Sequence, residues 1–183
     1  MKKTILTLLL AALSTMAYSQ EFFDLPKFDP SDIKIADVPV SSVRIPARGN
    51  RILVEKSKHL LTVYSEGAAI RVFTVDLGFG GMGKKLQEGD KLTPEGIYRI
   101  DFRNSKSQFY LSLHVTYPNK DDLEAAKKAG VHPGGQIYIH GYGDKTTYVK
   151  RRDWTYGCIA LTNSDMEELW NLVPNGIVLE IRQ

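Results

Sequence analysis

The residues of this chain best suited to covalent chemistry are its single cysteine, Cys158, and the histidine His140. A thiol becomes a strong nucleophile as the thiolate, and an imidazole within hydrogen-bond reach removes the proton and stabilises the anion. Gln136–His140 has the composition of a strand that ends at the histidine, and Cys158–Thr162 reads as a strand that opens at the cysteine. The loop between them is long enough to place the two strand ends side by side, so the sequence predicts a Cys/His catalytic pair.

Gly157 stands next to the cysteine, where a missing side chain lets the backbone approach a substrate closely. The amide groups at positions 157 and 158 could then form an oxyanion hole. Taken on these residues alone, the alternative stays open that Cys158 and His140 are both core residues, since a buried cysteine behaves as a small hydrophobe.

Two other motifs resemble catalytic signatures and are discounted. Gly78–Lys85 nearly matches the phosphate-binding pattern GxxxxGK followed by Ser or Thr, but position 85 is lysine and Gly89 and Pro94 prevent a long helix. We expect a flexible loop that borders a groove instead. Ser31–Lys34 matches SxxK of serine acyltransferases but lacks its SDN and KTG partners.

A zinc site would have to combine His132, His140 and Cys158, whose residue types suit the metal. HExxH and paired cysteines are absent from the sequence, so we predict neither a metal nor another cofactor. His59 and His114 are expected to have surface or packing roles.

The first residues have the pattern of a secretory signal peptide, predicted over residues 1–19. Lys2 and Lys3 precede an apolar run, Ile5–Ala12, and small residues end the segment at Ala17 and Ser19. The apolar run is too short for a membrane helix, which needs about 18 apolar residues, so we expect no membrane insertion. The signal segment holds no cysteine for a lipid anchor. We therefore expect an exported protein of the periplasm or cell envelope, in which a single cysteine has no internal disulfide partner.

The composition, with 43% hydrophobic and 25% charged residues, excludes a disordered or multi-span membrane protein. The formal net charge of +3 falls further once Lys2 and Lys3 are removed, so binding to nucleic acid by bulk charge is not expected.

Residues 20–49 are polar and punctuated by prolines, and we interpret them as an N-terminal leader or linker. Residues 50–183 form the expected catalytic domain, which is mostly β. Strands are predicted at Arg51–Glu55, Leu60–Tyr64, Ala69–Leu77, Ile97–Phe102, Phe109–Tyr117, Gln136–His140, Cys158–Thr162 and Ile177–Arg182.

Two segments have helical patterns. Asn119–Ala129 carries acids near its start and lysines near its end, with Gly130 as the stop. Ser164–Val173 opens with Ser164 and Glu167, the spacing of a capping box. The sequence thus predicts a mostly-β, sandwich-like domain with two short helices.

Several stretches together resemble the L,D-transpeptidase catalytic domain, or YkuD family, whose signature is His-Gly followed by Ser/Thr-His-Gly-Cys. The similar stretches, in family order, are Gly89–Gly96, Tyr117–Asn119, Pro133–Gly141 and Gly157–Asn163. They cover about residues 50 to 182 and imply an L,D-transpeptidase-like β-sandwich.

The resemblance implies an exported enzyme that acts on the stem peptides of bacterial peptidoglycan. In that family the cysteine, here Cys158, attacks the carbonyl of the third stem residue, expels the terminal D-alanine and forms a thioester. By position, His140 is the base and acid, and the backbone of Tyr156, Gly157 and Cys158 is the oxyanion hole. The carbonyl of Gly141 corresponds to the group that orients the histidine, with Asp144 and Asp153 as alternatives.

The acceptor of the acyl group stays open at this point. It could be an amine of a neighbouring stem, a wall-anchored protein or a free D-amino acid, whereas water would make the protein a carboxypeptidase or amidase. Tyr156 stands where the motif has histidine, Ala160 stands where many members are polar, and some similar subgroups hydrolyse. An inactive wall-binding module is the third alternative.

The loop between His140 and Cys158 could contribute to substrate binding. Its basic residues could pair with stem carboxylates, and its aromatic residues could line a groove. The candidates are Tyr142, Arg152 and Trp154, together with Lys145, Tyr148, Lys150 and Arg151.

Overall fold

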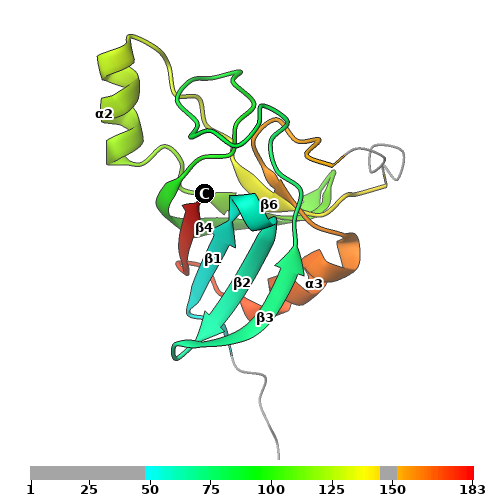
Figure 1. Ribbon diagram of the computed structural model, residues 1–183. Coiled ribbons are helices and arrows are strands. Elements are labelled where there is room, and N and C mark those ends of the chain that lie inside the picture. The colour runs from blue at the N-terminus through cyan, green and yellow to red at the C-terminus, as the bar shows by residue number, and fades with distance from the viewer. Residues whose placement is uncertain (1–47, 145–151) are drawn as a thin grey trace, which may run out of the picture. The chain divides into compact units, whose positions relative to one another are not determined.

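The computed structural model of the chain describes residues 48–144 and 152–183. The predicted signal peptide, the leader up to residue 47 and the SxxK match at 31–34 lie outside these residues. The elements, labelled as in Figure 1, are β1 (Arg51–Glu55), η4 (Lys56–Lys58), β2 (Leu60–Ser65), β3 (Ala68–Thr74), β4 (Gly96–Ser107), β5 (Tyr110–Val115), α2 (Lys120–Ala129), β6 (Tyr138–His140), β7 (Ile159–Ala160), α3 (Asn163–Leu172) and β8 (Val178–Arg182).

The strands form one sheet of 8 strands in the order β3-β2-β1-β8-β4-β5-β6-β7. Strands β1 and β8 are parallel neighbours, with Arg51 opposite Val178 and Glu55 opposite Arg182. The first and last strands of the domain therefore lie side by side in the middle of the sheet. Strands β6 and β7 are also parallel, and this second parallel pair carries the candidate catalytic residues.

Strand β4 joins the two halves of the sheet. Its start, Gly96–Arg99, pairs with β8, and its continuation from Ile100 pairs with β5. A register shift between Ile100 and Phe102 marks a bulge, which bends a strand and increases its twist. The mostly-β class with two short helices is confirmed, and the expected sandwich takes the form of a single curled sheet, a half-barrel.

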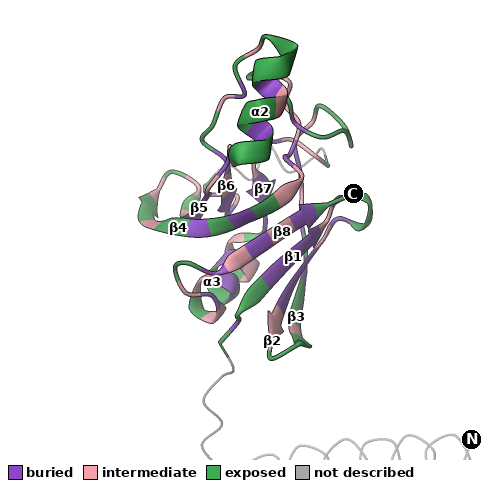
Figure 2. Cartoon of the chain, turned by 90° about the vertical axis from the view of Figure 1, so that its left-hand side faces the viewer, coloured by how far each residue is buried: buried purple, intermediate pink, exposed green. Residues whose placement is uncertain are grey.

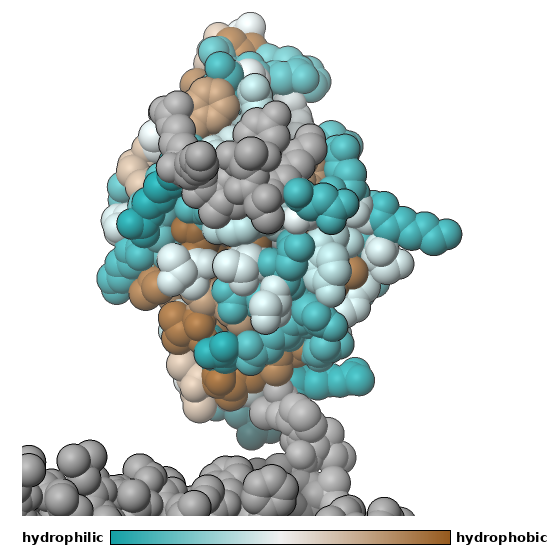
Figure 3. All heavy atoms as spheres, turned by 90° about the vertical axis from the view of Figure 1, so that its right-hand side faces the viewer, coloured by the Kyte–Doolittle hydropathy of each residue, from teal (hydrophilic) through white to brown (hydrophobic). Residues whose placement is uncertain are grey.

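Alternate residues of the strands fill the core of this curl, together with Met166 and Leu169 of α3 (Figure 2, purple). Strand β3 has one paired neighbour, β2, and most of its side chains stay exposed. Figure 3 shows apolar surface in the lower part of the face where β3 and α3 lie, consistent with the exposure of Val72.

Helix α2 ends at Ala129 as predicted and begins at Lys120, one residue later than predicted, because Asn119 is its N-cap. The Asn119 side chain accepts from the Asp122 amide and the Asp122 carboxylate accepts from the Asn119 amide, which is a capping box, and Gly130 ends the helix in the left-handed region. Asp122 also accepts a hydrogen bond of 2.9 Å from the hydroxyl of Tyr98. This buried contact attaches the otherwise largely exposed helix to the sheet (Figure 2).

Helix α3 begins one residue earlier than predicted, at Asn163, and ends at Leu172. Its N-cap is Thr162, whose side chain accepts from the amide of Asp165, so the predicted capping box of Ser164 and Glu167 is wrong. Both residue pairs have the same spacing, and the extended backbone at Thr162 is what selects the first as the cap.

Five strands, β3, β5, β6, β7 and β8, are shorter than predicted. Strand β3 stops at Thr74, and β6 starts only at Tyr138 because Gln136 adopts a left-handed conformation with φ 58°. Strand β7 starts at Ile159, so Cys158 lies just before the strand rather than opening it. Neither helix in the described part of the chain is long and apolar enough to cross a membrane.

Candidate active site

His140 is the last residue of β6 and lies in a row of paired residues that crosses the sheet. It is opposite Ser112 of β5, which is opposite Asn104 of β4, and on its other side it is opposite Ala160 of β7. Paired residues on neighbouring strands share a face of the sheet, so this row places the imidazole beside two polar side chains. His140 is nevertheless only 4% exposed.

The ring of His140 is fixed on several sides. Its Nδ1 lies 2.7 Å from the carbonyl oxygen of Gly141, and its ring centroid lies 4.6 Å from that of Phe109 and 5.7 Å from that of Trp154. A carbonyl only accepts, so Nδ1 carries the proton and Nε2 keeps an unprotonated lone pair. Burial lowers the pKa of His140 despite the opposing hydrogen bond to Gly141. The imidazole is therefore a neutral base near pH 7.

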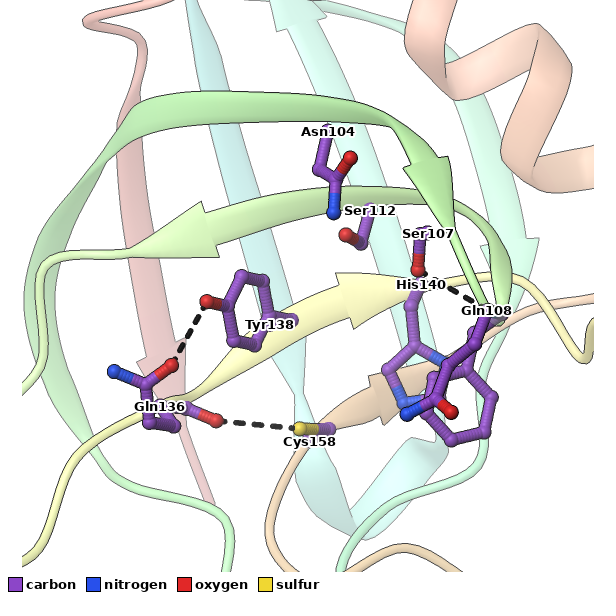
Figure 4. Close-up of a pocket in the computed structure, with 9 residues that line it drawn as sticks. Asn104, Ser107, Gln108, Ser112, Gln136, Tyr138, His140 and Cys158 are labelled. Carbon is purple, nitrogen blue, oxygen red and sulfur yellow. Dashed lines mark hydrogen bonds between the residues drawn. The ribbon is translucent and has the colours of Figure 1, made fainter.

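Cys158 lies on the same side of the sheet as His140 and Tyr138, with its thiol directed toward the cavity (Figure 4). The sulfur donates to the carbonyl oxygen of Gln136 at 3.7 Å, which directs it away from His140. Burial raises the pKa of the thiol, and the Tyr138 backbone and the charge of Lys85 oppose that shift. The resting pair is therefore a thiol and a neutral imidazole, and rotation about the Cα–Cβ bond of Cys158 is needed to bring the sulfur toward the base.

The backbone before the cysteine is held by Thr155. Its Oγ1 donates to the Cys158 carbonyl at 2.6 Å and accepts from the Gly157 amide at 3.2 Å. Of the three amides assigned to an oxyanion hole, that of Gly157 is therefore already engaged. Within the described residues, the Tyr156 and Cys158 amides have no acceptor and are available to an oxyanion.

The glycine-rich stretch that begins at Gly78 packs against this segment. A Cβ at Gly157, where φ is +121°, would lie 2.7 Å from the Leu92 carbonyl oxygen, and a Cβ at Gly78 would lie 2.2 Å from that of Lys91. These distances are shorter than real Cβ contacts, so only glycine fits at these two positions. The glycines thereby allow the loops around residues 78, 91 and 157 to pack closely together. The stretch holds no helix, in agreement with its exclusion as a phosphate-binding loop.

A cavity of about 350 Å³ opens in front of the thiol (Figure 4). Most of its lining residues carry a polar side-chain group, and they come from β4, β5, the turn between them, the β6 region and Cys158. The lining residues are Asn104, Ser107, Gln108, Phe109, Ser112, Gln136, Tyr138, His140 and Cys158. The cavity can therefore hold a polar peptide group against the sulfur.

Sequence reasoning missed the wall of this cavity that the β4–β5 hairpin provides. Gln108 and Phe109 come from the turn, Ser107 ends β4, and Asn104 and Ser112 come from paired strand positions. A signal for this wall was present in the sequence, because polar residues alternate along each of the two predicted strands. When such residues fall on one face of two adjacent strands, that face is exposed rather than part of the core. Thr155 was also missed, although it stands at the Ser/Thr position of the family signature.

The three weaker substrate-binding candidates lie outside the cavity wall. Tyr142 donates to the Asp76 carboxylate at 2.8 Å, Trp154 packs against His140, and Arg152 is exposed. The remaining basic and aromatic candidates, Lys145, Tyr148, Lys150 and Arg151, lie outside the described residues.

The alternative orienting residues are placed elsewhere. Asp153 binds Nε2 of His59 with both oxygens, at 2.9 and 3.0 Å, and also accepts from the Leu77 amide. Asp144 is exposed. Gly141 is the predicted residue whose carbonyl contacts the His140 ring.

The arrangement of the described residues does not support a zinc site formed by His132, His140 and Cys158. His132 is exposed and lies 3.3 Å from Glu88. In residues 48–144 and 152–183 no group of three or more His, Cys, Asp or Glu side chains is arranged to hold a metal ion. Lys85, which broke the phosphate-loop pattern, is buried and pairs with Asp90 at 2.7 Å.

Comparison with known families assigns this domain to one of them. The model of the YkuD family, described as the L,D-transpeptidase catalytic domain, matches residues 49–181. That match covers the whole sheet, both helices and the cavity, and the chain belongs to the YkuD family.

Individual relatives agree with this family. The chain is 28% identical over 101 residues to YafK of Escherichia coli K12, which is named as an L,D-transpeptidase, across 54% of this chain and 35% of YafK. The crystal structure of the helical cell shape determining protein Pgp2 from Campylobacter jejuni is 29% identical, with a TM-score of 0.58 over 72% of this chain and 46% of Pgp2. The chain thus spans less than half the length of both relatives.

A more distant structure shows the fold alone. The L,D-transpeptidase of Stackebrandtia nassauensis is 16% identical and has a TM-score of 0.51 over 81% of this chain and 62% of its own. The half-barrel fold is thus shared with an L,D-transpeptidase of low sequence identity to this chain.

Proposed function

We propose that this protein is an exported cysteine acyltransferase that acts on the stem peptides of peptidoglycan through a thioester on Cys158. The observation that carries the proposal is that His140, the last residue of β6, and Cys158, just before the adjacent parallel strand β7, line one cavity. Membership of the L,D-transpeptidase family supplies the substrate class.

In the proposed acylation, Nε2 of His140 takes the thiol proton as the sulfur attacks the carbonyl carbon of the third stem residue. The amides of Tyr156 and Cys158 donate to the oxyanion that develops, and the hydrogen bond from Nδ1 to Gly141 stabilises the imidazolium. The imidazolium then protonates the leaving nitrogen. The C–N bond breaks, the terminal D-amino acid departs and a thioester remains on Cys158.

In the second step an acceptor amine attacks the thioester carbon and gives a proton to His140. Collapse of the intermediate expels the sulfur, which regains its proton from the imidazolium. The product is a new amide, and the enzyme returns to its starting state. The acceptor is an amine of a second stem, of a wall-anchored protein or of a free D-amino acid.

Hydrolysis is the second candidate function, because the cavity beside Cys158 is polar and can admit water. Water would then attack the thioester, and the protein would shorten stems or release a wall-linked protein as a carboxypeptidase or amidase. The similarity to Pgp2, named as a cell shape determining protein, supports a role of either activity in cell shape.

The deciding experiment incubates the protein with purified muropeptides that carry tetrapeptide stems, followed by mass spectrometry of protein and products. We expect a thioester adduct on Cys158 and release of D-alanine. Dimers or exchanged stems indicate transfer, whereas tripeptides indicate hydrolysis.

The control variant Cys158→Ala should fold normally, since a smaller apolar side chain replaces a thiol with one weak hydrogen bond, and should lose all turnover. Turnover by this variant would overturn the thiol mechanism. Wild-type protein that binds peptidoglycan without forming an adduct would favour the wall-binding module.

Export is part of the proposal and rests on the signal pattern of residues 1–19. Cell fractionation followed by N-terminal sequencing should recover a chain that begins at Gln20 in the envelope fraction. Recovery of the intact N-terminus in the cytoplasm would contradict it.

A further inference from the structure

A half-buried lysine, Lys91, lies beside two aromatic rings that contact each other near the proposed nucleophile. The Lys91 ammonium lies 4.7 Å from the ring centroid of Phe79 and 5.9 Å from that of Tyr156. The two rings meet edge to face, with centroids 5.1 Å apart. We call these three residues the Lys91 cluster.

The Lys91 ammonium makes no ion pair and no hydrogen bond with residues 48–144 and 152–183. Two neighbouring lysines behave differently. Lys85 is bound by Asp90 and the Gln87 carbonyl, and Lys56 by Glu95 and three carbonyls. A cation that rings hold in place without an anion is ready to accept an anionic ligand.

The loop that carries Lys91 is held in place through its backbone. Asp90 accepts from the amides of Leu86, Gln87 and Leu92, which fixes the loop. The Lys91 carbonyl accepts from the Gly80 amide at 2.9 Å.

The next carbonyl, that of Leu92, touches Gly157, the residue before the nucleophile. Tyr156, the residue before Gly157, is 75% exposed. The Lys91 cluster therefore lies on the side of residues 155–158 where Gly157 packs against Leu92. The cavity lining comes mainly from other elements, β4, β5 and β6.

An ammonium pairs most strongly with a carboxylate, by a charge-assisted hydrogen bond. A stem peptide offers two carboxylates close to the bond that breaks. One is the terminal carboxylate of the expelled residue, and the other is the side-chain carboxylate of a diaminopimelate at the third position. On the basis of the proposed function, we propose that the Lys91 cluster is a carboxylate-binding site that selects stem peptides next to Cys158.

The first test needs no peptidoglycan. Cys158 is alkylated with iodoacetate, which carries a carboxylate, and with neutral iodoacetamide, and the two rates are expressed as a ratio. Lys91→Met should lower the ratio by roughly threefold to tenfold, the size of a moderate ionic contact. The matched variant Lys128→Met, on the exposed face of α2, should leave it unchanged. An equal ratio in wild type and Lys91→Met would overturn the proposal.

The second test compares tetrapeptide substrates with a free terminus, with an amidated terminus, and with lysine in place of diaminopimelate. One of the two altered substrates lacks the carboxylate that Lys91 binds. For that substrate the kcat/KM of the wild type should be roughly tenfold lower than for the unmodified tetrapeptide. Lys91→Met should not discriminate, and Lys91→Arg should restore discrimination. The substrate with the lowered kcat/KM shows which of the two carboxylates Lys91 binds.

Equal turnover of all three substrates by the wild type would overturn the carboxylate site. No turnover of any peptide would instead overturn the proposed function, and the alkylation ratio would then decide on Lys91 by itself.

Discussion

His140 and Cys158 lie at the ends of neighbouring strands, yet the protein holds them in different ways. The His140 side chain is fixed by the Gly141 carbonyl and by two aromatic rings. The thiol of Cys158 has a 3.7 Å contact to the Gln136 carbonyl and an interaction with the Tyr138 backbone, and the main chain around Cys158 is fixed by Thr155. The proposed base is thus positioned through its ring and the proposed nucleophile through its main chain, which leaves the sulfur one torsion with which to reach the imidazole.

Both groups are uncharged at rest because burial acts on them in opposite directions. Burial lowers the pKa of His140 and raises that of Cys158, and each shift disfavours the charged form. A preformed thiolate–imidazolium pair is therefore not expected in the substrate-free protein. Proton transfer should accompany the attack on the substrate.

Removing the proposed base, His140, should cause the largest loss of activity. His140→Gln keeps a polar side chain but cannot take the thiol proton, and loss of a general base costs about 100- to 10,000-fold. We expect kcat/KM to fall by roughly a thousandfold and alkylation of Cys158 near neutral pH to slow. An unchanged alkylation rate and pH profile would remove His140 from the site.

The next largest effect should come from the backbone that carries the nucleophile. In Gly157→Ala a Cβ would lie 2.7 Å from the Leu92 carbonyl oxygen, on a residue with φ +121°. Such strain costs about 1–3 kcal/mol, and relief of it would move Cys158. We expect urea denaturation to show a loss of that size and kcat/KM to fall at least tenfold. Gly135→Ala, where a Cβ meets open space, is the matched control and should do neither.

Much of this architecture could be predicted from local sequence patterns. The acidic start, the basic end and the Gly130 stop of α2 depend on residues within that segment, and these predictions are confirmed. The bounds predicted for β1, Arg51–Glu55, are also confirmed. The cap of α3 could not be assigned, because Thr162 with Asp165 and Ser164 with Glu167 offer equivalent local bonds. The bend of β4 also escaped prediction, since it depends on β8 and β5 pairing with different parts of one strand.

The site divides in the same way. Cys158, His140 and Gly141 could be proposed because their spacing carries a signature. The direction of the thiol and the placement of the β4–β5 wall opposite Cys158 depend on contacts between segments far apart in the sequence. The occupied Gly157 amide depends on the side-chain direction of Thr155, two residues earlier. A local reading of the sequence does not contain that information.

A smaller effect should appear in the pH dependence of stability. The pKa of His140 is lower in the folded protein than its ordinary value of 6.5, so the unfolded chain binds the proton more readily. Stability should therefore be lost as pH falls below about 6.5, by up to about 1.4 kcal/mol per pH unit from this residue. Urea denaturation of wild type and His140→Gln at several pH values should give a smaller slope for the variant. Equal slopes would show that groups other than His140 cause the acid sensitivity.

The smallest effect concerns the hydroxyl that holds the nucleophile's backbone. Thr155→Val keeps the shape but removes the bonds to the Cys158 carbonyl and the Gly157 amide, which should cost about 1–2 kcal/mol. Thr155→Ser retains both bonds and should stay close to wild type in stability.

Kinetics separate the two roles that Thr155 could have. If the hydroxyl positions the nucleophile, Thr155→Val should lower kcat several-fold with little change in KM, and Thr155→Ser should restore kcat. If valine and serine are equally impaired, the methyl group and its packing matter rather than the hydrogen bonds, and the contrast between a nucleophile held by its backbone and a base held by its ring would fail. Because Thr155 lies inside the segment and is buried, neither variant should alter the carboxylate preference assigned to Lys91.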